Sequence, residues 1–139
     1  MLYIHTNGYK MKPELELQTT KDDLLTLGHT PLSKEVLVVR LANTTVTGDY
    51  AYNGHRIYKS FMDSNGDIES KNDWGSHVFG RYIIDNNGQF SVEWDGYWDA
   101  WTGIAFEVEG DIKFYDINTG EWRTTFHNIL EGRHPLEVK

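Results

Sequence analysis

The sequence predicts a mainly β domain, a small antiparallel up-and-down barrel of about seven or eight strands with a short N-terminal helical region. Turn-forming Asn, Asp and Gly residues recur between short apolar and aromatic runs, as at 64–67, 86–88 and 118–120. These residue types adopt positive φ at little cost, so they favour tight hairpins between antiparallel strands. Closing such a meander into a barrel removes the exposed edges that an open sheet would keep.

The chain has 139 residues, the length of one ordinary domain. Residues 1–20 show no clear period and are expected to be an N-terminal extension, with a single barrel domain over 21–139. Residues 21–27 have a helical pattern that Gly28 would end. A leader helix is expected over 31–41, because Thr30 suits its N-cap and Pro31 its first position.

The strands are placed between the turn signals, and residues 129–139 are expected to form a polar tail. The expected strands are 44–51, 55–63, 67–71, 77–85, 89–95, 103–109, 111–117 and 121–128. Apolar and polar residues alternate most clearly from residue 89 onward, where Phe90, Val92 and Trp94 share one face. Ile104 and Phe106 alternate in the same way, which is typical of a half-buried antiparallel sheet.

The amino-acid composition limits the classes of binding partner that we expect. The formal net charge is -8 and there is no Cys, so disulfides and thiolate sites are excluded. An acidic surface repels phosphate backbones and anionic lipid, and no apolar run is long enough to span a membrane. We therefore expect no nucleic-acid or membrane partner, and a homo-oligomer stays open. A cytoplasmic location is expected, with export after removal of a signal as the less favoured alternative.

Three of the five Trp residues lie in the segment 93–101, together with Tyr97 and three acidic residues. Trp side chains favour partly buried places with a partner for the indole N–H, so the cluster indicates the wall of a pocket. We expect a barrel that binds a small aromatic or apolar molecule. The expected lining is Trp94, Tyr97, Trp98, Trp101, Tyr58, Tyr82 and Phe106, with Arg81, His55 and His77 as polar anchors.

Two alternatives remain. A lyase, isomerase or hydrolase without a cofactor would use His and carboxylate groups inside the barrel. Its candidate catalytic residues are His55, His77, Glu93, Asp95 and His127. No two His residues have a common metal-binding spacing, so no metal is expected. The second alternative is a carbohydrate-binding or interaction module, in which Trp98 and Trp101 would lie flat on the surface.

Five segments carry a resemblance to a known group of proteins. They are the Gly-containing strand 43–48, the turn 63–66, the motif Gly80-Arg81-Tyr82, the strand 90–94 and the hairpin 109–116. Their order resembles a bacterial domain-of-unknown-function family of small lipocalin-like (calycin-like) barrels. The resemblance implies a barrel fold and supplies no catalytic residues. The family commonly carries a Cys pair, and Trp where Tyr82 stands, and this chain departs from both features.

Overall fold

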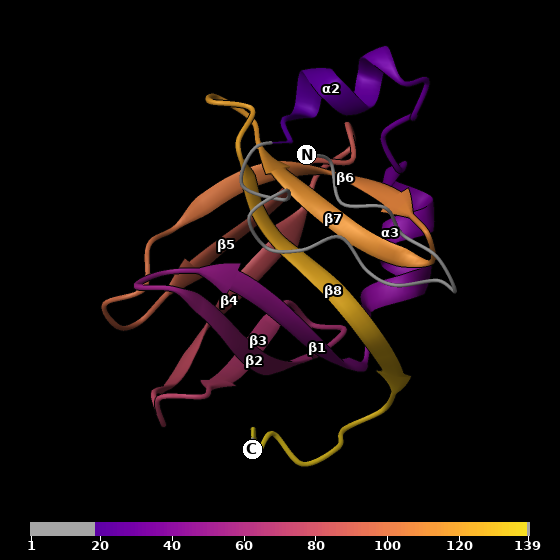
Figure 1. Ribbon diagram of the computed structural model, residues 1–139. Coiled ribbons are helices and arrows are strands. Elements are labelled where there is room, and N and C mark those ends of the chain that lie inside the picture. The colour runs from indigo at the N-terminus through magenta and orange to yellow at the C-terminus, as the bar shows by residue number, and fades with distance from the viewer. Residues whose placement is uncertain (1–18, 139) are drawn as a thin grey trace.

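The computed structural model, which describes residues 19–138, confirms the predicted fold class: eight antiparallel strands form a closed barrel (Figure 1). Each strand pairs with the next along the chain, and the first also pairs with the last. The strands are β1 (Thr44–Ala51), β2 (His55–Met62), β3 (Asp67–Asn72), β4 (His77–Ile84), β5 (Phe90–Trp94), β6 (Trp101–Val108), β7 (Asp111–Asp116) and β8 (Trp122–Glu131). The helices α2 (Lys21–Thr26) and α3 (Lys34–Leu41) precede them. Of the expected extension 1–20, residues 1–18 lie outside the described residues.

Three turns are built on the same local device. Asp63, Asp85 and Asp116 each end or follow a strand, and each accepts the backbone N–H of the residue two positions later through its Oδ1 atom, at 2.8–3.0 Å. Such a side-chain bond reproduces a backbone turn. The β6–β7 hairpin instead uses Glu109 and Gly110, both at positive φ, as a two-residue turn of this kind requires.

Helix α3 closes one end of the barrel. Leu37 and Leu41 are fully buried and belong to the same core cluster as the strands. The expected start at residue 31 was wrong, because the helix begins at Lys34 with Ser33 as its N-cap. The preceding residue, Leu32, is held in another way: its backbone N–H donates to the carbonyl oxygen of Ala105 on β6, 2.7 Å away.

Two strand limits differ from expectation by more than one residue, because these strands stay paired with their neighbours beyond the predicted limits. β8 runs to Glu131, which pairs with Thr44, so residues 129–131 belong to the sheet rather than to a tail. β6 begins at Trp101, which pairs with Val92 on β5. At the other end of the barrel from α3, the loops β1–β2, β3–β4, β5–β6 and β7–β8 come together, and this end is open.

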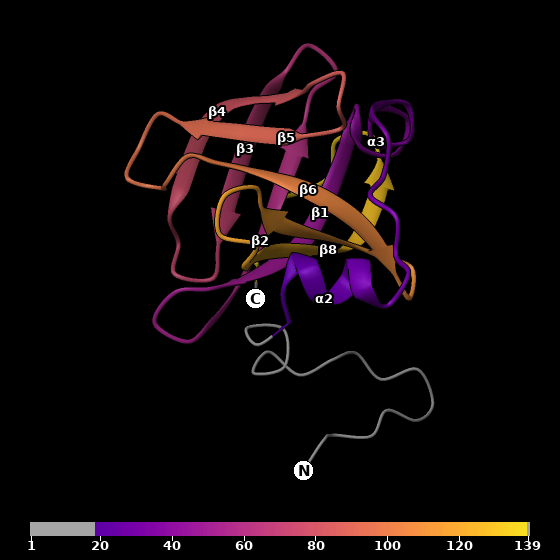
Figure 2. The same ribbon diagram turned by 90° about the horizontal axis from the view of Figure 1, so that it is seen from above.

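The strands β6 and β7 are buried on both faces. Inside the barrel, Phe90, Phe114 and Phe126 form the centre of the main core. Outside it, Leu24 of α2 packs in a second cluster with aromatic residues of β6, β7 and β8. Figure 2 shows α2 against the outside of the barrel. That cluster contains Leu24, Phe106, Tyr115 and Trp122. The short helix α2 therefore covers an outer face of the barrel that would otherwise be apolar and exposed.

Candidate functional site

A cavity of about 600 Å³ lies at the open end of the barrel. Its walls come from the four loops of that end and from the adjoining halves of the strands, and its floor is formed by core residues such as Phe90 and Phe126. The volume is within the range of about 300–1,000 Å³ that is common for small-molecule sites. The cavity can hold a small organic molecule without a change in the barrel.

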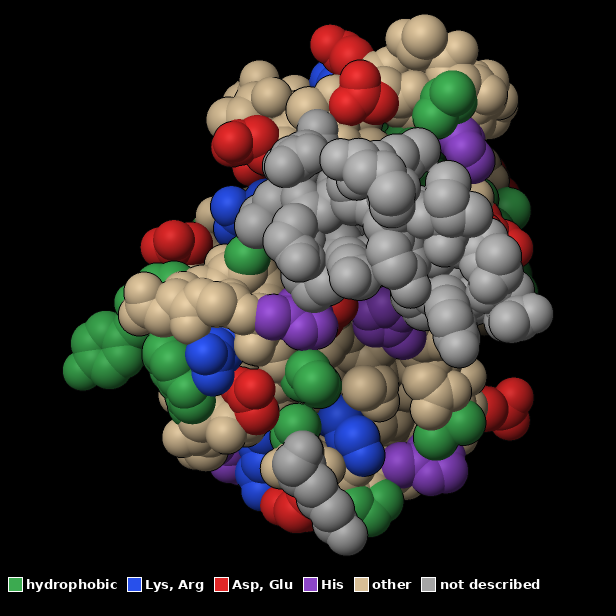
Figure 3. Space-filling view, viewed as in Figure 1, with side chains coloured by type: hydrophobic (Ala, Val, Ile, Leu, Met, Phe, Trp, Pro, Cys, Tyr) green, Lys and Arg blue, Asp and Glu red, His purple; other side chains and the backbone are tan. Residues whose placement is uncertain are grey.

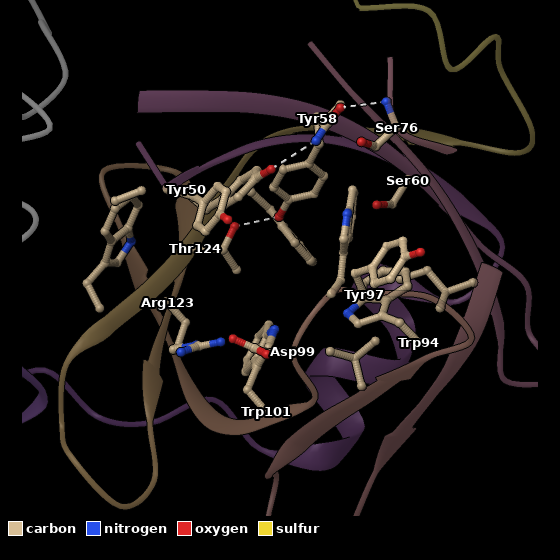
Figure 4. A pocket seen from close by; sticks show the side chains of 18 of the residues that line it. Tyr50, Tyr58, Ser60, Ser76, Trp94, Tyr97, Asp99, Trp101, Arg123 and Thr124 are labelled. Atoms are coloured by element: carbon tan, nitrogen blue, oxygen red, sulfur yellow. Dashed lines mark hydrogen bonds between the residues drawn. The ribbon is translucent and has the colours of Figure 1, made fainter. Parts of the chain in front are cut away.

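Aromatic side chains form much of the cavity wall (Figure 4). Trp98 packs edge-on against Trp94 with ring centres 5.0 Å apart, and it also contacts Tyr50 at 6.3 Å. Tyr50 in turn packs edge-on against Tyr58, at 5.7 Å. Trp101 packs against the core ring Phe90 at 5.5 Å. These rings present flat, partly buried apolar surfaces to the cavity, a surface that suits a flat molecule.

Hydrogen bonds fix the polar groups on the wall formed by β1, β2, β3 and β8. The hydroxyl of Thr124 donates to the carbonyl oxygen of Asp49 at 2.7 Å, so it accepts the hydroxyl proton of Tyr58, whose oxygen is 2.5 Å away. The side-chain oxygen of Asn72 accepts the backbone N–H groups of Trp74 and Ser76. Its amide nitrogen must then donate to the hydroxyl of Tyr50, at 3.1 Å.

Deeper in the cavity, Ser60 on β2 lies among apolar residues. Its hydroxyl is hydrogen-bonded to that of Ser70 on β3, and both side chains are buried. Buried polar groups of this kind are normally paired, because an unpaired one loses its hydration without compensation. The floor of the cavity therefore carries one small polar patch in an otherwise apolar surface.

The two phenols of the wall stay protonated at ordinary pH. Burial raises the pKa of Tyr58 far above its usual value, against the opposing effect of the hydrogen bond to Thr124. Burial likewise raises the pKa of Tyr50, and its contact with Asn72 only partly offsets this. A phenolate in such a place would lose its hydration, which is why the neutral form is favoured.

The charged residues of the lining belong to the mouth. They are Asp99 in the β5–β6 loop, Glu121 before β8 and Arg123 at the start of β8. Figure 4 shows Asp99 and Arg123 on the same side of the cavity, beside Trp101. The guanidinium carbon of Arg123 lies 5.6 Å from the centre of the Trp101 ring, within the range of a cation–π contact.

Five of the residues expected to line a pocket do border this cavity: Tyr58, Trp94, Tyr97, Trp98 and Trp101. Tyr97 stands at the rim with its side chain fully exposed. Trp98 and Trp101 are half-buried, so neither lies flat on the surface. Whether any of them binds a ligand stays a prediction.

The other expected lining residues, Phe106 and Tyr82, and the expected polar anchors Arg81, His55 and His77 lie outside this cavity. Phe106 faces outward into the cluster beneath α2, because β6 is buried on both faces and the alternation pattern does not tell inside from outside. Tyr82 stacks on Phe90 and donates its hydroxyl to the carbonyl oxygen of Asp63, 2.6 Å away, at the closed end. Arg81 is exposed and pairs with Asp67 on the outer surface.

None of the candidate catalytic residues lines the cavity. Imidazole groups are visible on the outer surface in Figure 3. His77 pairs with Glu69, with 2.6 Å between Nε2 and Oε2, on the outer faces of β4 and β3. Glu93 is an exposed residue of β5, and Asp95 follows that strand and is held by a backbone bond to Phe79.

His55 and His127 meet in an array on the outer faces of β1, β2, β7 and β8. The carboxylate of Asp49 lies 2.5 Å from Nε2 of His55 and 3.0 Å from Nε2 of His127. Asp111 lies 3.1 Å from the other ring nitrogen of His127. Burial alone would raise the pKa of Asp49, but the two imidazoles outweigh it and the net pKa is lowered. The contact with Asp49 raises the pKa of His127, although burial opposes this change.

The cavity also contains residues that the sequence did not single out: Tyr50, Asn72, Ser60 and Thr124. Gly48, in the middle of a strand, indicates a close approach of another group, and that group is Tyr58 rather than Tyr50. Nothing in the sequence indicated that Asn72, Thr124 and Ser60 lie on the same wall, since three different strands carry them.

Comparison with protein-family models, with curated proteins and with solved structures finds no match for this chain. The resemblance to the small bacterial barrels therefore stays a prediction. Within residues 19–138, no three His, Asp or Glu side chains are grouped so that they could hold a metal ion. In the same part of the chain, no helix is both long enough and apolar enough to cross a membrane.

Proposed function

We propose that the protein binds a small aromatic or apolar molecule in the cavity at the open end of the barrel. The observation that carries this proposal is the cavity itself, about 600 Å³ in volume and walled by the rings of Tyr50, Trp94, Trp98 and Trp101. A closed barrel with one end covered by α3 and the other open offers a preformed apolar space, which lowers the free energy needed to order a ligand.

The placement of the other candidate residues favours binding over catalysis. The imidazoles of His55, His77 and His127 lie outside the cavity lining, so they have no access to a molecule held there. Trp98 and Trp101 are half-buried and pack against neighbouring rings, which favours a pocket wall over a flat surface platform.

Intrinsic Trp fluorescence tests the proposal. The protein is titrated with naphthalene, indole and larger flat apolar compounds, and saturable quenching by at least one is expected. Trp98→Ala should weaken binding by about ten-fold, because a ring that packs on a ligand contributes on the order of 1–1.5 kcal/mol. Phe79→Ala is the matched control, since that ring is 53% exposed on β4 and does not border the cavity. The absence of saturable quenching across the whole panel would contradict the proposal.

A further inference from the structure

We infer that the cavity selects a neutral, flat molecule that carries an oxygen acceptor, such as the carbonyl of an aromatic ketone, lactone or quinone. This inference rests on the proposed function and adds the chemical class of the ligand. Two observations support it: some hydroxyl protons of the cavity wall have no acceptor within the described part of the chain, and the charged lining residues lie at the mouth of the cavity.

Tyr50 offers a proton to the cavity. The carbonyl oxygen of the Asn72 side chain is occupied by two backbone N–H groups, which forces its amide to donate to Tyr50. The phenol oxygen is therefore an acceptor toward Asn72, and its own proton points elsewhere. Among the described residues, Tyr50 makes no second hydrogen bond, so a ligand oxygen can accept that proton.

Ser60 offers a second proton near the floor. Only one proton is used between the hydroxyls of Ser60 and Ser70, so the other must find an acceptor or stay unpaired. Ser70 is fully buried and does not border the cavity, whereas Ser60 does. The arrangement in which Ser70 donates to Ser60 avoids an orphaned buried donor and leaves the Ser60 proton to the cavity.

Tyr58, in contrast, has no proton to offer to a ligand in the cavity. Its proton is given to Thr124, because the Thr124 proton is itself given to the carbonyl oxygen of Asp49. The wall thus presents at least two neutral hydroxyl donors, Tyr50 and Ser60, among its aromatic rings. A flat molecule with an acceptor oxygen matches both features.

The charges argue against an ionised ligand. The polar groups in the deeper part of the lining are neutral hydroxyl and amide groups, and a carboxylate moved there would lose its hydration without meeting a cation. At the mouth, Asp99 and Glu121 oppose the single guanidinium of Arg123. An anionic molecule is therefore disfavoured at the entrance as well as inside.

Three probes of nearly the same shape separate these requirements: 2-acetylnaphthalene, 2-ethylnaphthalene and 2-naphthoate. Each is titrated against the full chain and against Tyr50→Phe and Ser60→Ala. At least one substitution should weaken the binding of 2-acetylnaphthalene by about five-fold, which corresponds to the usual contribution of one hydrogen bond. The same substitution should change the affinity for 2-ethylnaphthalene by less than about two-fold. Ser64→Ala removes a hydroxyl from the exposed turn between β2 and β3, away from the cavity, and should leave both affinities unchanged. At pH 7, 2-naphthoate should bind at least ten-fold more weakly than 2-acetylnaphthalene.

The outcomes are distinguishable. The inference is overturned if the acetyl and ethyl compounds lose affinity by the same factor in both variants. It is also overturned if 2-naphthoate binds as tightly as the ketone. In either case the proposed function stands. If none of the three probes binds the unmodified protein, the proposed function fails and the inference fails with it. Binding of the ethyl compound to each variant also shows that the variant is folded.

Discussion

The phenol ring of Tyr58 occupies the space that a side chain on Gly48 would need. The two residues are paired across β1 and β2, and a Cβ atom at Gly48 would lie 2.6 Å from the Tyr58 hydroxyl oxygen. The same Cβ would lie 2.7 Å from the carbonyl oxygen of Thr125 on β8. Gly48 thus lets one aromatic ring lie across a strand and reach Thr124, which positions the polar wall of the cavity.

Gly48→Ala should therefore destabilise the protein. The added methyl group meets a backbone oxygen that cannot move without distorting β8, and we expect a loss of about 1–3 kcal/mol in the free energy of unfolding. Urea denaturation measures it. Gly96→Ala is the matched control, because its Cβ would meet only the end of the Val78 side chain, at 3.3 Å. Equal stability of the two variants would show that the space at Gly48 is not restrictive.

Leu24→Ala tests the outer cluster beneath α2. Leu24 is 4% exposed and Leu27, one turn later, is 73% exposed. The first substitution should lower the free energy of unfolding by about 2 kcal/mol through lost burial and a residual cavity, and Leu27→Ala should change it little. Neither Leu24 nor Leu27 borders the cavity, so probe binding there should stay the same in both variants. A change in affinity with Leu24→Ala would contradict this expectation and would show that Trp122, which belongs to both the cluster and the cavity lining, couples the two.

The array of Asp49 and His127 predicts a pH dependence of stability. His127 has a raised pKa, so its contribution is complete below its ordinary value of 6.5 and is lost as the pH rises through the folded-state pKa. Asp49 has a lowered pKa, so its contribution is present above 3.8 and is lost as the pH falls through the folded-state pKa. The window of greatest benefit lies between these two values.

His127→Gln should therefore destabilise the protein more at pH 6 than at pH 9, as measured by urea denaturation at both values. The control is His29→Gln, because His29 forms no ion pair within the described part of the chain. Its effect should be the same at the two pH values. A loss for His127→Gln that does not depend on pH would mean that the imidazole acts by packing alone.

The two carboxylates at the mouth of the cavity predict that an anionic ligand is repelled there. Asp99→Asn combined with Glu121→Gln should strengthen the binding of 2-naphthoate by roughly two- to five-fold at low salt, and the gain should shrink at high salt. Glu93→Gln removes the same kind of charge from the outside of β5, away from the cavity. An equal gain from this control would indicate a general effect of net charge, without a local role for the mouth.

Local chemistry explains why much of the fold was predictable. Pairs such as Glu109-Gly110 and Asn65-Gly66 define where the chain reverses, and the alternation of Phe90 and Val92 defines an inward face. The start of α3 was harder to predict from the sequence, since Thr30-Pro31 and Ser33 are both acceptable N-termini by local rules. The bond from Leu32 to Ala105, across more than seventy residues, decides between them.

The candidate site was predictable only in part, because it depends on contacts between strands. The segment with Trp94, Trp98 and Trp101 could be found as a cluster in the sequence. The direction of Phe106 could not, since a strand covered by α2 is apolar on both faces. The meeting of Asp49 with His127 depends on closure of the barrel, which brings β1 beside β8.

The closure of the barrel also places the beginning of its first strand beside the end of its last strand. Thr44, the first residue of β1, pairs with Glu131, the last of β8, and the backbone N–H of Gly132 donates to the carbonyl oxygen of Asn43 at 2.7 Å. The chain therefore enters and leaves the barrel at one point. A circularly permuted polypeptide, with the two present ends of the chain linked and new termini opened at the turn after Asp85, would keep every strand neighbour that it has now.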